Sequence, residues 1–249
     1  MKKILKKVIL FLVLANVGFG DIAQNLGDYY SINKGKVYYG NEILEEANPK
    51  TAELIGFSLL KDDKNVYYMG EKIKDVKIKN FEKLGQNYWK NDNKIYYRDE
   101  KIENADIMSF KVLNEDYAKD KNHVYSGNEV IDPSPLLGKI KNPETFEFLP
   151  NGIIYGILYG KDKYNVYYIK NKMLNCFDSS YFIYEVKRIN KDKVEVLNNW
   201  FIKDDKNIYF EGEILEGVDY NTFEVLPNGD GKDKNRSYEY LPKDEWRWF

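Results

Sequence analysis

The chain has 249 residues, of which 43% are hydrophobic, 31% charged and 16% aromatic, with 22 tyrosines. This composition excludes a disordered chain, and the length is sufficient for one or two domains with a buried core. A single cysteine, Cys176, excludes an internal disulfide framework and a multi-cysteine metal site. A single histidine, His123, argues against a histidine-rich metal site or a Ser-His-Asp triad. The net charge of −2 argues against nucleic-acid binding, which requires a basic surface.

The N-terminus has the layout of a secretory signal peptide over residues 1–20. Four lysines fall within residues 1–7, an uncharged apolar run occupies residues 8–17, and small residues stand at Gly18 and Gly20 before the expected cut. A membrane anchor is the alternative, but the apolar run is shorter than the ~20 residues that span a bilayer. We therefore expect an exported chain, periplasmic, at the cell surface or extracellular, without stable membrane insertion. Loss of four of its 38 basic residues leaves 34 against 40 acidic ones, a net charge of −6.

Residues 21–249 are predicted to form one domain of tandem repeats. A Val/Ile-Tyr pair recurs inside a Lys-Asp-rich frame, as in residues 61–68 and 203–210. The first tyrosine of each copy marks the repeat: Tyr38, Tyr67, Tyr96, Tyr125, Tyr167, Tyr209 and Tyr238. The successive spacings are 29, 29, 29, 42, 42 and 29 residues, so each long spacing is the standard repeat plus 13. Self-similarity at a fixed period indicates a repeat architecture.

Each copy reads as a small β-meander. In the fourth copy, Tyr117-Ala118-Lys119 and His123-Val124-Tyr125 have the composition of strands, and Asp120-Lys121-Asn122 between them has that of a turn. No segment shows the sustained 3.6-residue periodicity of a long amphipathic helix. The expected fold is therefore all-β, with seven units of about 29 residues, each containing three or four short strands.

The residues around the repeat tyrosine predict how the units pack. The preceding residue is Val or Ile in six copies, and the following residue is aromatic in five. Because neighbours on a strand point to opposite faces, each central strand is covered on both sides. Stacking of the units in an open, solenoid-like array satisfies this requirement. A closed, propeller-like ring is the alternative, although 29 residues is short for a blade of about 40. Ser237 and Glu239 replace the usual residues in the last copy, which we interpret as a terminal cap.

Two segments, residues 62–68 (DDKNVYY) and 162–168 (DKYNVYY), resemble the bacterial DKNYY repeat family, whose name is the consensus of this turn and strand. The resemblance covers most of residues 29–240 and recurs in register. Departures occur at Ser126, at Glu239 and in the first copy. The resemblance implies a bacterial origin and a repeat architecture, and it carries no catalytic residues over to this chain.

The acidic turns suggest two kinds of chemistry, and neither fits well. Calcium needs six to eight oxygen ligands, whereas lysines such as Lys64 and Lys206 interrupt these loops. A glycosidase needs two carboxylates on opposite sides of a sugar bond, whereas pairs such as Asp62 and Asp63 recur in several copies without defining one site. Capped, solvated turns explain the pattern better. We predict no catalytic residues, no cofactor and no metal, hence no enzyme.

Aromatic residues and insertions are the remaining candidates for function. Repeated tyrosines can form a sugar-binding ladder, but we favour their being core residues whose hydroxyl reaches a neighbouring turn. The extra residues are placed near Pro133–Lys139, Gly152–Leu158 and Glu185–Asn198. Tyr155, in the second segment, and Trp200, just after the third, are possible binding residues. Insertions in repeat arrays often carry the binding face. The function we expect is an exported, non-catalytic scaffold for an unknown partner protein; the alternative is a module that binds glycan or the cell envelope.

Overall fold

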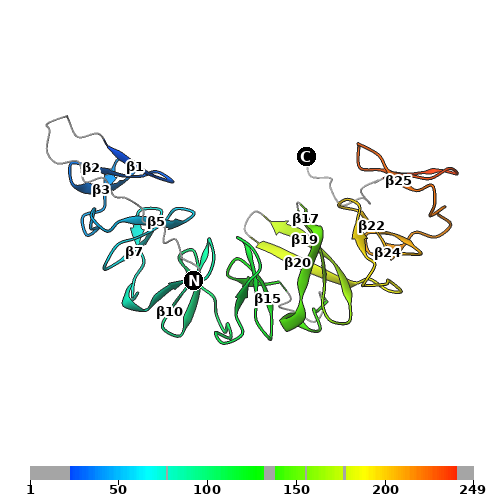
Figure 1. The fold of residues 1–249 in the computed structure, drawn as a ribbon, viewed down its shortest axis with the longest axis horizontal. Helices are drawn as coiled ribbons and strands as arrows, with labels where there is room; N and C mark the ends of the chain where they lie inside the picture. The colour runs from blue at the N-terminus through cyan, green and yellow to red at the C-terminus, as the bar shows by residue number, and fades with distance from the viewer. Residues whose placement is uncertain (1–22, 77, 132–137, 155, 176–177, 240–249) are drawn as a thin grey trace, which may run out of the picture.

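A computed structural model describes residues 23–76, 78–131, 138–154, 156–175 and 178–239 (Figure 1). The expected signal peptide, most of the insertion expected near Pro133–Lys139, Tyr155, Cys176 and the C-terminal residues from 240 onward lie outside the described residues. The described chain forms seven small antiparallel sheets, one for each repeat tyrosine, numbered here repeat 1 to repeat 7. The sheets follow one another in chain order along an open arc (Figure 1). The predicted all-β array is confirmed, and the array does not close into a ring.

Every sheet is a meander in which sequential strands pair. Repeats 1 to 3 contain β1 (Gln24–Gly27), β2 (Tyr30–Asn33), β3 (Lys36–Tyr39), β4 (Glu42–Ile43), β5 (Glu53–Gly56), β6 (Leu59–Lys61), β7 (Val66–Tyr68), β8 (Glu71–Lys72), β9 (Phe81–Lys83), β10 (Tyr88–Asn91), β11 (Lys94–Tyr97) and β12 (Glu100–Lys101). Repeats 4 and 5 contain β13 (Lys111–Val112), β14 (Tyr117–Lys119), β15 (Val124–Ser126), β16 (Glu129–Val130), β17 (Glu147–Ile154), β18 (Ile157–Lys161), β19 (Val166–Asn175) and β20 (Asp178–Glu185). Repeats 6 and 7 contain β21 (Glu195–Val196), β22 (Phe201–Lys203), β23 (Ile208–Phe210), β24 (Glu213–Ile214), β25 (Glu224–Val225), β26 (Gly231–Lys232) and β27 (Ser237–Tyr238). In the described part of the chain, two short 3-10 helices, η1 (Ile78–Asn80) and η3 (Pro143–Thr145), lie in the linkers between repeats.

Hydrophobic clusters form between consecutive repeats. Each cluster combines the Val or Ile of one repeat with the repeat tyrosine of the next. The pairs are Val37 with Tyr67, Val66 with Tyr96, Ile95 with Tyr125, Val124 with Tyr167, and Val166 with Tyr209. The two faces of one strand therefore serve two different interfaces, as the alternation in the sequence predicts. At the ends of the described array, Tyr38 and Tyr238 are only half-buried and Ser237 is exposed, because each terminal repeat has a described repeat on one side only.

A buried aspartate holds the turn before the repeat tyrosine in five repeats. These aspartates are 1–4% exposed: Asp62, Asp120, Asp162, Asp204 and Asp233. In each of these aspartates, Oδ1 accepts hydrogen bonds from the backbone N–H groups two and three residues later, at 2.6–2.9 Å. Oδ2 accepts a backbone N–H from the preceding linker, at 2.7–3.0 Å. We call this arrangement the aspartate turn.

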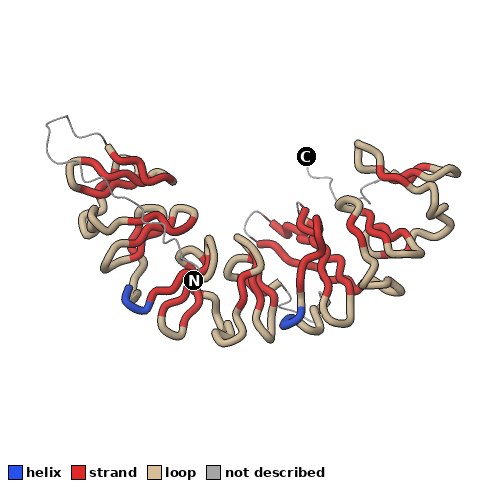
Figure 2. The backbone as a smooth tube through the Cα atoms, in the orientation of Figure 1, coloured by secondary structure: helices blue, strands red, loops and turns tan. Residues whose placement is uncertain are grey.

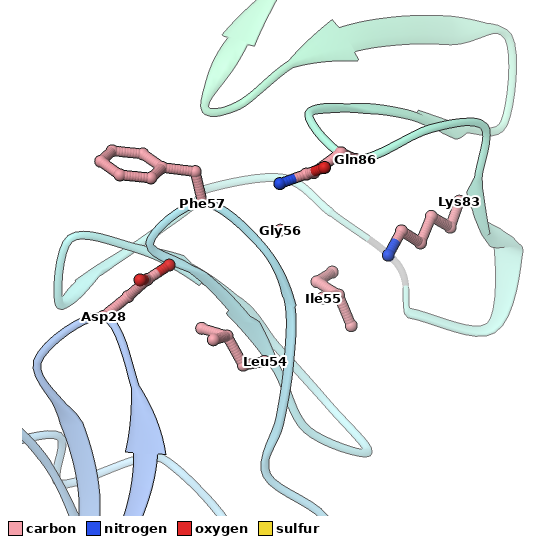
Figure 3. A pocket seen from close by; sticks show the side chains of 7 residues that line it. All are labelled: Asp28, Leu54, Ile55, Gly56, Phe57, Lys83 and Gln86. Carbon is pink, nitrogen blue, oxygen red and sulfur yellow. The ribbon is translucent and has the colours of Figure 1, made fainter. Parts of the chain in front are cut away.

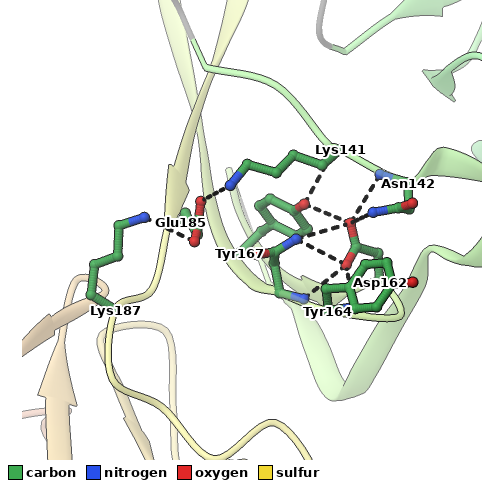
Figure 4. A network of polar contacts seen from close by, with 8 residues as sticks. Lys141, Asn142, Asp162, Tyr164, Tyr167, Glu185 and Lys187 are labelled. Carbon is green, nitrogen blue, oxygen red and sulfur yellow. Dashed lines mark hydrogen bonds and ion pairs between the residues drawn. The ribbon is translucent and has the colours of Figure 1, made fainter.

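The repeat tyrosine completes the aspartate turn in four of these repeats. The hydroxyl groups of Tyr125, Tyr167, Tyr209 and Tyr238 donate to the aspartate five residues earlier. Figure 4 shows the fifth repeat, where Tyr167 donates to Asp162 at 2.6 Å and the Asn142 N–H donates to the same carboxylate at 3.0 Å. One carboxylate thus links a turn, a core tyrosine and the preceding linker. The Asp-Lys-Asn consensus and the tyrosine are parts of a single structural unit.

The structure corrects where the last insertion lies. Asn190 donates its N–H to Asp204 across 14 residues, the separation also found in repeats 2, 4 and 7. Residues 190–209 therefore keep the standard register, and the thirteen extra residues precede Asn190, in the long β19–β20 hairpin, not in Glu185–Asn198. The tyrosine spacing counts inserted residues but does not locate them, since a lengthened hairpin continues the strand pattern. The insertion near Gly152–Leu158 lengthens the β17–β18 hairpin, which is the position predicted from the sequence.

The long hairpin of repeat 5 also explains why Ser126 stands where other repeats carry an aromatic residue. Tyr181, on β20, is 8% exposed and belongs to the cluster between repeats 4 and 5. Its hydroxyl lies 2.9 Å from Ser126 Oγ. A phenol from the following repeat thus approaches the small side chain of Ser126.

We expect Ser126→Tyr to destabilise the protein by about 1–3 kcal/mol, because a second phenol would overpack this place. Tyr181→Ala is expected to cost about 3 kcal/mol through the cavity it leaves. Because each side chain fills the space vacated by the other, the double variant should lose clearly less than the sum of the two. Urea denaturation of the four proteins measures the coupling. Strictly additive losses would show that the two side chains do not share one space.

Candidate functional site

The array has two different edges along its arc. Turns between the second and third strands of each repeat lie on the convex edge with the linkers and helices η1 and η3 (Figure 2). Turns between the first and second strands, and between the third and fourth, lie together on the concave edge. Hydrogen bonds join these two turns within a repeat, for example Gly40 N–H to Tyr29 O and Met69 N–H to Ser58 O. The long hairpins of repeat 5 reach into the concave side of the arc (Figure 1).

The two edges differ in charge. The described turns of the concave edge are residues 28–29, 40–41, 57–58, 69–70, 85–87, 98–99, 114–116, 127–128, 198–200, 211–212 and 227–230. They contain six acidic residues, Asp28, Asp99, Glu115, Asp116, Glu211 and Asp230, one basic residue, Arg98, and no lysine. The convex turns carry acids too, such as Asp62 and Asp63, but a lysine accompanies or replaces them in six of the seven repeats, so their charges nearly balance. In a chain this rich in lysine, the concave edge is therefore a distinctly acidic surface.

Large apolar side chains are exposed among these acids. Tyr29 is 78% exposed, Met69 49% and Phe57 48%. The Tyr29 ring contacts Tyr39 edge-on, and the guanidinium of Arg98 lies 5.1 Å from the centre of the Phe57 ring. Tyr29 belongs to repeat 1, and Phe57 and Met69 belong to repeat 2. Exposed aromatic groups beside charged ones are typical of binding surfaces.

A pocket of about 450 Å³ opens on the concave edge where repeats 1, 2 and 3 meet. Its lining is Asp28, Leu54, Ile55, Gly56, Phe57, Lys83 and Gln86. Figure 3 shows Asp28 and Lys83 at opposite ends, with the aliphatic side chains of Leu54 and Ile55 between them. An added Cβ at Gly56 would lie 2.2 Å from the Gln86 carbonyl oxygen, so glycine allows the turn of repeat 3 to approach this closely. The pocket is a shallow depression, open to solvent over much of its extent.

The structure places the predicted site residues as follows. Five repeat tyrosines, Tyr67, Tyr96, Tyr125, Tyr167 and Tyr209, are 0–6% exposed and lie between repeats. Burial raises the pKa of Tyr67 and of Tyr209 to about 12, and the nearby aspartates add to the effect. Trp200 lies on the concave edge in the standard register of repeat 6, where it is half-buried against the core cluster.

In repeats 3 and 5 the aromatic residue after the repeat tyrosine also reaches the next repeat. Tyr97 donates its hydroxyl to Asp116 in repeat 4 at 2.6 Å, and Tyr168 donates to Glu211 in repeat 6 at 3.2 Å. Burial and the Asp116 carboxylate raise the pKa of Tyr97. Gly212 has a φ of +82°, and an added Cβ would lie 3.0 Å from Tyr168.

Sequence reasoning missed Tyr29, Phe57 and Met69. Tyr29 lies nine residues before its repeat tyrosine, the slot that Trp200 occupies in repeat 6, and Phe57 lies ten before. These slots vary from copy to copy, which is the available signal for a surface position. Among the described residues, no group of three or more His, Cys, Asp or Glu side chains could hold a metal ion. The helices of this part of the chain are too short and too polar for a membrane span.

An open array of β-meanders, locked by buried aspartates and lined along one edge by acidic turns, defines a β-repeat protein. The sequence profile of the DKNYY family matches residues 33–90 and 88–241. The chain belongs to the DKNYY family, and the resemblance read from the two turn-and-strand segments is confirmed. Searches among curated proteins and among solved structures gave no match.

Proposed function

We propose that this chain is an exported, non-catalytic scaffold that binds a partner protein along the concave edge. One observation carries the proposal: Tyr29, Phe57 and Met69 are exposed among acidic turns, whereas the central repeat tyrosines are buried between repeats. A surface with apolar anchors and a polar rim is the usual anatomy of a protein interface. The signal-peptide pattern of residues 1–20 supports export.

Loss of the three anchors should abolish partner capture without unfolding the array. The test immobilises the chain lacking residues 1–20 and compares it with the variant Tyr29→Ser/Phe57→Ser/Met69→Ser. Proteins captured from an envelope extract are quantified by mass spectrometry. The matched control is Tyr164→Ser/Met108→Ser, which removes side chains that are 63% and 93% exposed, on a convex turn and in a linker.

The proposal expects a specific set of proteins that the control retains and the anchor variant loses. Equal capture by all three proteins would contradict it. Retention of a polysaccharide, with no protein lost in the anchor variant, would favour the glycan-binding alternative. Urea midpoints of the three proteins, expected to agree closely, show whether the substitutions leave the fold intact.

A further inference from the structure

The pocket shared by repeats 1, 2 and 3 has the chemistry to recognise one kind of side chain. We propose that it takes a lysine or arginine side chain from a basic segment of the partner protein, an inference that rests on the proposed function. The aliphatic stem of such a residue would lie over Leu54 and Ile55, its charge would meet Asp28, and its backbone carbonyl would face Gln86 and Lys83. Long basic side chains commonly combine apolar stem contacts with a charged end in this way.

Asp28 is held in place to act as the acceptor. One of its carboxylate oxygens accepts the Ser58 N–H at 2.7 Å, across 30 residues and two repeats. This bond fixes the carboxylate at one end of the pocket, so an incoming cation meets an oriented acceptor. Charge-assisted hydrogen bonds to a carboxylate are stronger than neutral ones.

The opposite end of the pocket sets the direction of the ligand. Lys83 is exposed and stands apart from Asp28, on the far side of Ile55 (Figure 3). The Lys83 ammonium repels the charged end of a basic side chain, which leaves the Asp28 end as its place, while the same ammonium suits a carbonyl oxygen.

The surroundings favour a basic partner over an acidic one. Five further acids line the described concave turns; Asp116 is paired with Arg98 and Glu211 with Lys170, and Asp99, Glu115 and Asp230 remain in excess over the bases of these turns. Fields of one sign steer oppositely charged partners and raise their association rate. A basic segment longer than one residue would therefore extend from the pocket along the edge towards Asp99, Glu115 and Asp116.

Carbodiimide coupling identifies the acid that meets the cation, with acetylated octalysine as the probe. The reagent joins a carboxylate to a nearby amine as an amide, and peptide mass spectrometry then reads the coupled residue. We expect Asp28 to be the main coupled acid, and addition of salt to reduce the coupling. An octaglutamate peptide should not compete, whereas unlabelled octalysine should.

Two charge-matched and two aromatic variants give the affinity test, by fluorescence anisotropy of labelled octalysine. Asp28→Asn keeps an oxygen for the Ser58 N–H and should weaken binding at least fivefold, and Phe57→Ala at least threefold. Glu144→Gln, in helix η3 on the convex side, and Tyr164→Ala, in a convex turn, should change binding less than twofold.

Coupling spread over many acids, or equal losses in Asp28→Asn and Glu144→Gln, would overturn the pocket assignment. Preferential binding of chitohexaose over octalysine would overturn it too. Neither result contradicts the proposed function, which is tested separately by the capture of partner proteins on the concave edge. Conversely, Asp28 coupling with unchanged capture by the anchor variant would retain the pocket and reject the protein-scaffold function.

Discussion

Replacement of Tyr125 by alanine is expected to lower the free energy of unfolding by about 3–5 kcal/mol. Its side chain is 0% exposed, its ring centre lies 5.7 Å from that of Phe110, and its hydroxyl donates to Asp120 at 2.7 Å. The substitution opens a cavity between repeats 3 and 4 and removes a donor from a buried carboxylate. Because repeat arrays are stabilised by their neighbour interfaces, a loss in the middle weakens the coupling of the two halves. Urea denaturation followed by circular dichroism and tyrosine fluorescence measures the change.

Two further variants separate the contributions of Tyr125. Tyr125→Phe keeps the ring and loses the hydrogen bond, and should cost about 1–2 kcal/mol. Lys94→Ala, at an exposed site on the convex edge, should cost about 0.5 kcal/mol or less. Divergence of the two spectroscopic transitions in Tyr125→Ala alone would show that the array unfolds in two parts. A loss for Tyr125→Ala no larger than that for Lys94→Ala would contradict the assignment of the tyrosine to the core.

Asp162→Ala is expected to cost about 2–4 kcal/mol, because it leaves buried donors without their acceptor. The carboxylate accepts the N–H groups of Asn142, Tyr164 and Asn165 and the hydroxyl of Tyr167 (Figure 4). The turn and the linker that precedes it should loosen together. Hydrogen exchange of these three amides, measured with the urea midpoint, tests both parts. Faster exchange confined to the turn would show that the linker is held by other contacts.

The same carboxylates make the array sensitive to acid. Burial alone would raise the pKa of Asp162 and of Asp204, but the hydrogen bonds they accept outweigh it and hold both pKa values below the usual 3.8. A lowered folded-state pKa contributes stability above the unfolded-state value, and this stability is lost as pH falls through the folded-state pKa. The urea midpoint should therefore stay level near neutral pH and fall below about pH 4. Asp162→Asn should flatten that fall; an unchanged slope would argue that other carboxylates cause it.

The repeat tyrosines show how much of the fold the periodic pattern of the sequence predicts. Val66-Tyr67 is apolar on both faces, and a strand with two apolar faces must be covered twice, which predicts stacking without knowledge of any contact. The sequence did not reveal the role of Asp162. An aspartate in a turn gives no sign that its second oxygen accepts a hydrogen bond from a backbone N–H in the linker, 20 residues earlier. The thirteen residues of the long hairpin were counted correctly and placed wrongly, since the tyrosine spacing gives the number of added residues but not their position between two tyrosines.

The sequence by itself determined the all-β class, the number of repeats, their family and their stacking, because each of these depends on local patterns that recur at a fixed period. Only the tertiary structure decided that the array is open, that Tyr181 fills the place beside Ser126, and that Asp28, Phe57 and Lys83 meet in one pocket. These features depend on the position of the long hairpin in repeat 5 and on the rotation from one sheet to the next. That rotation is the sum of many small contacts between repeats, and residue spacing along the chain carries no record of it.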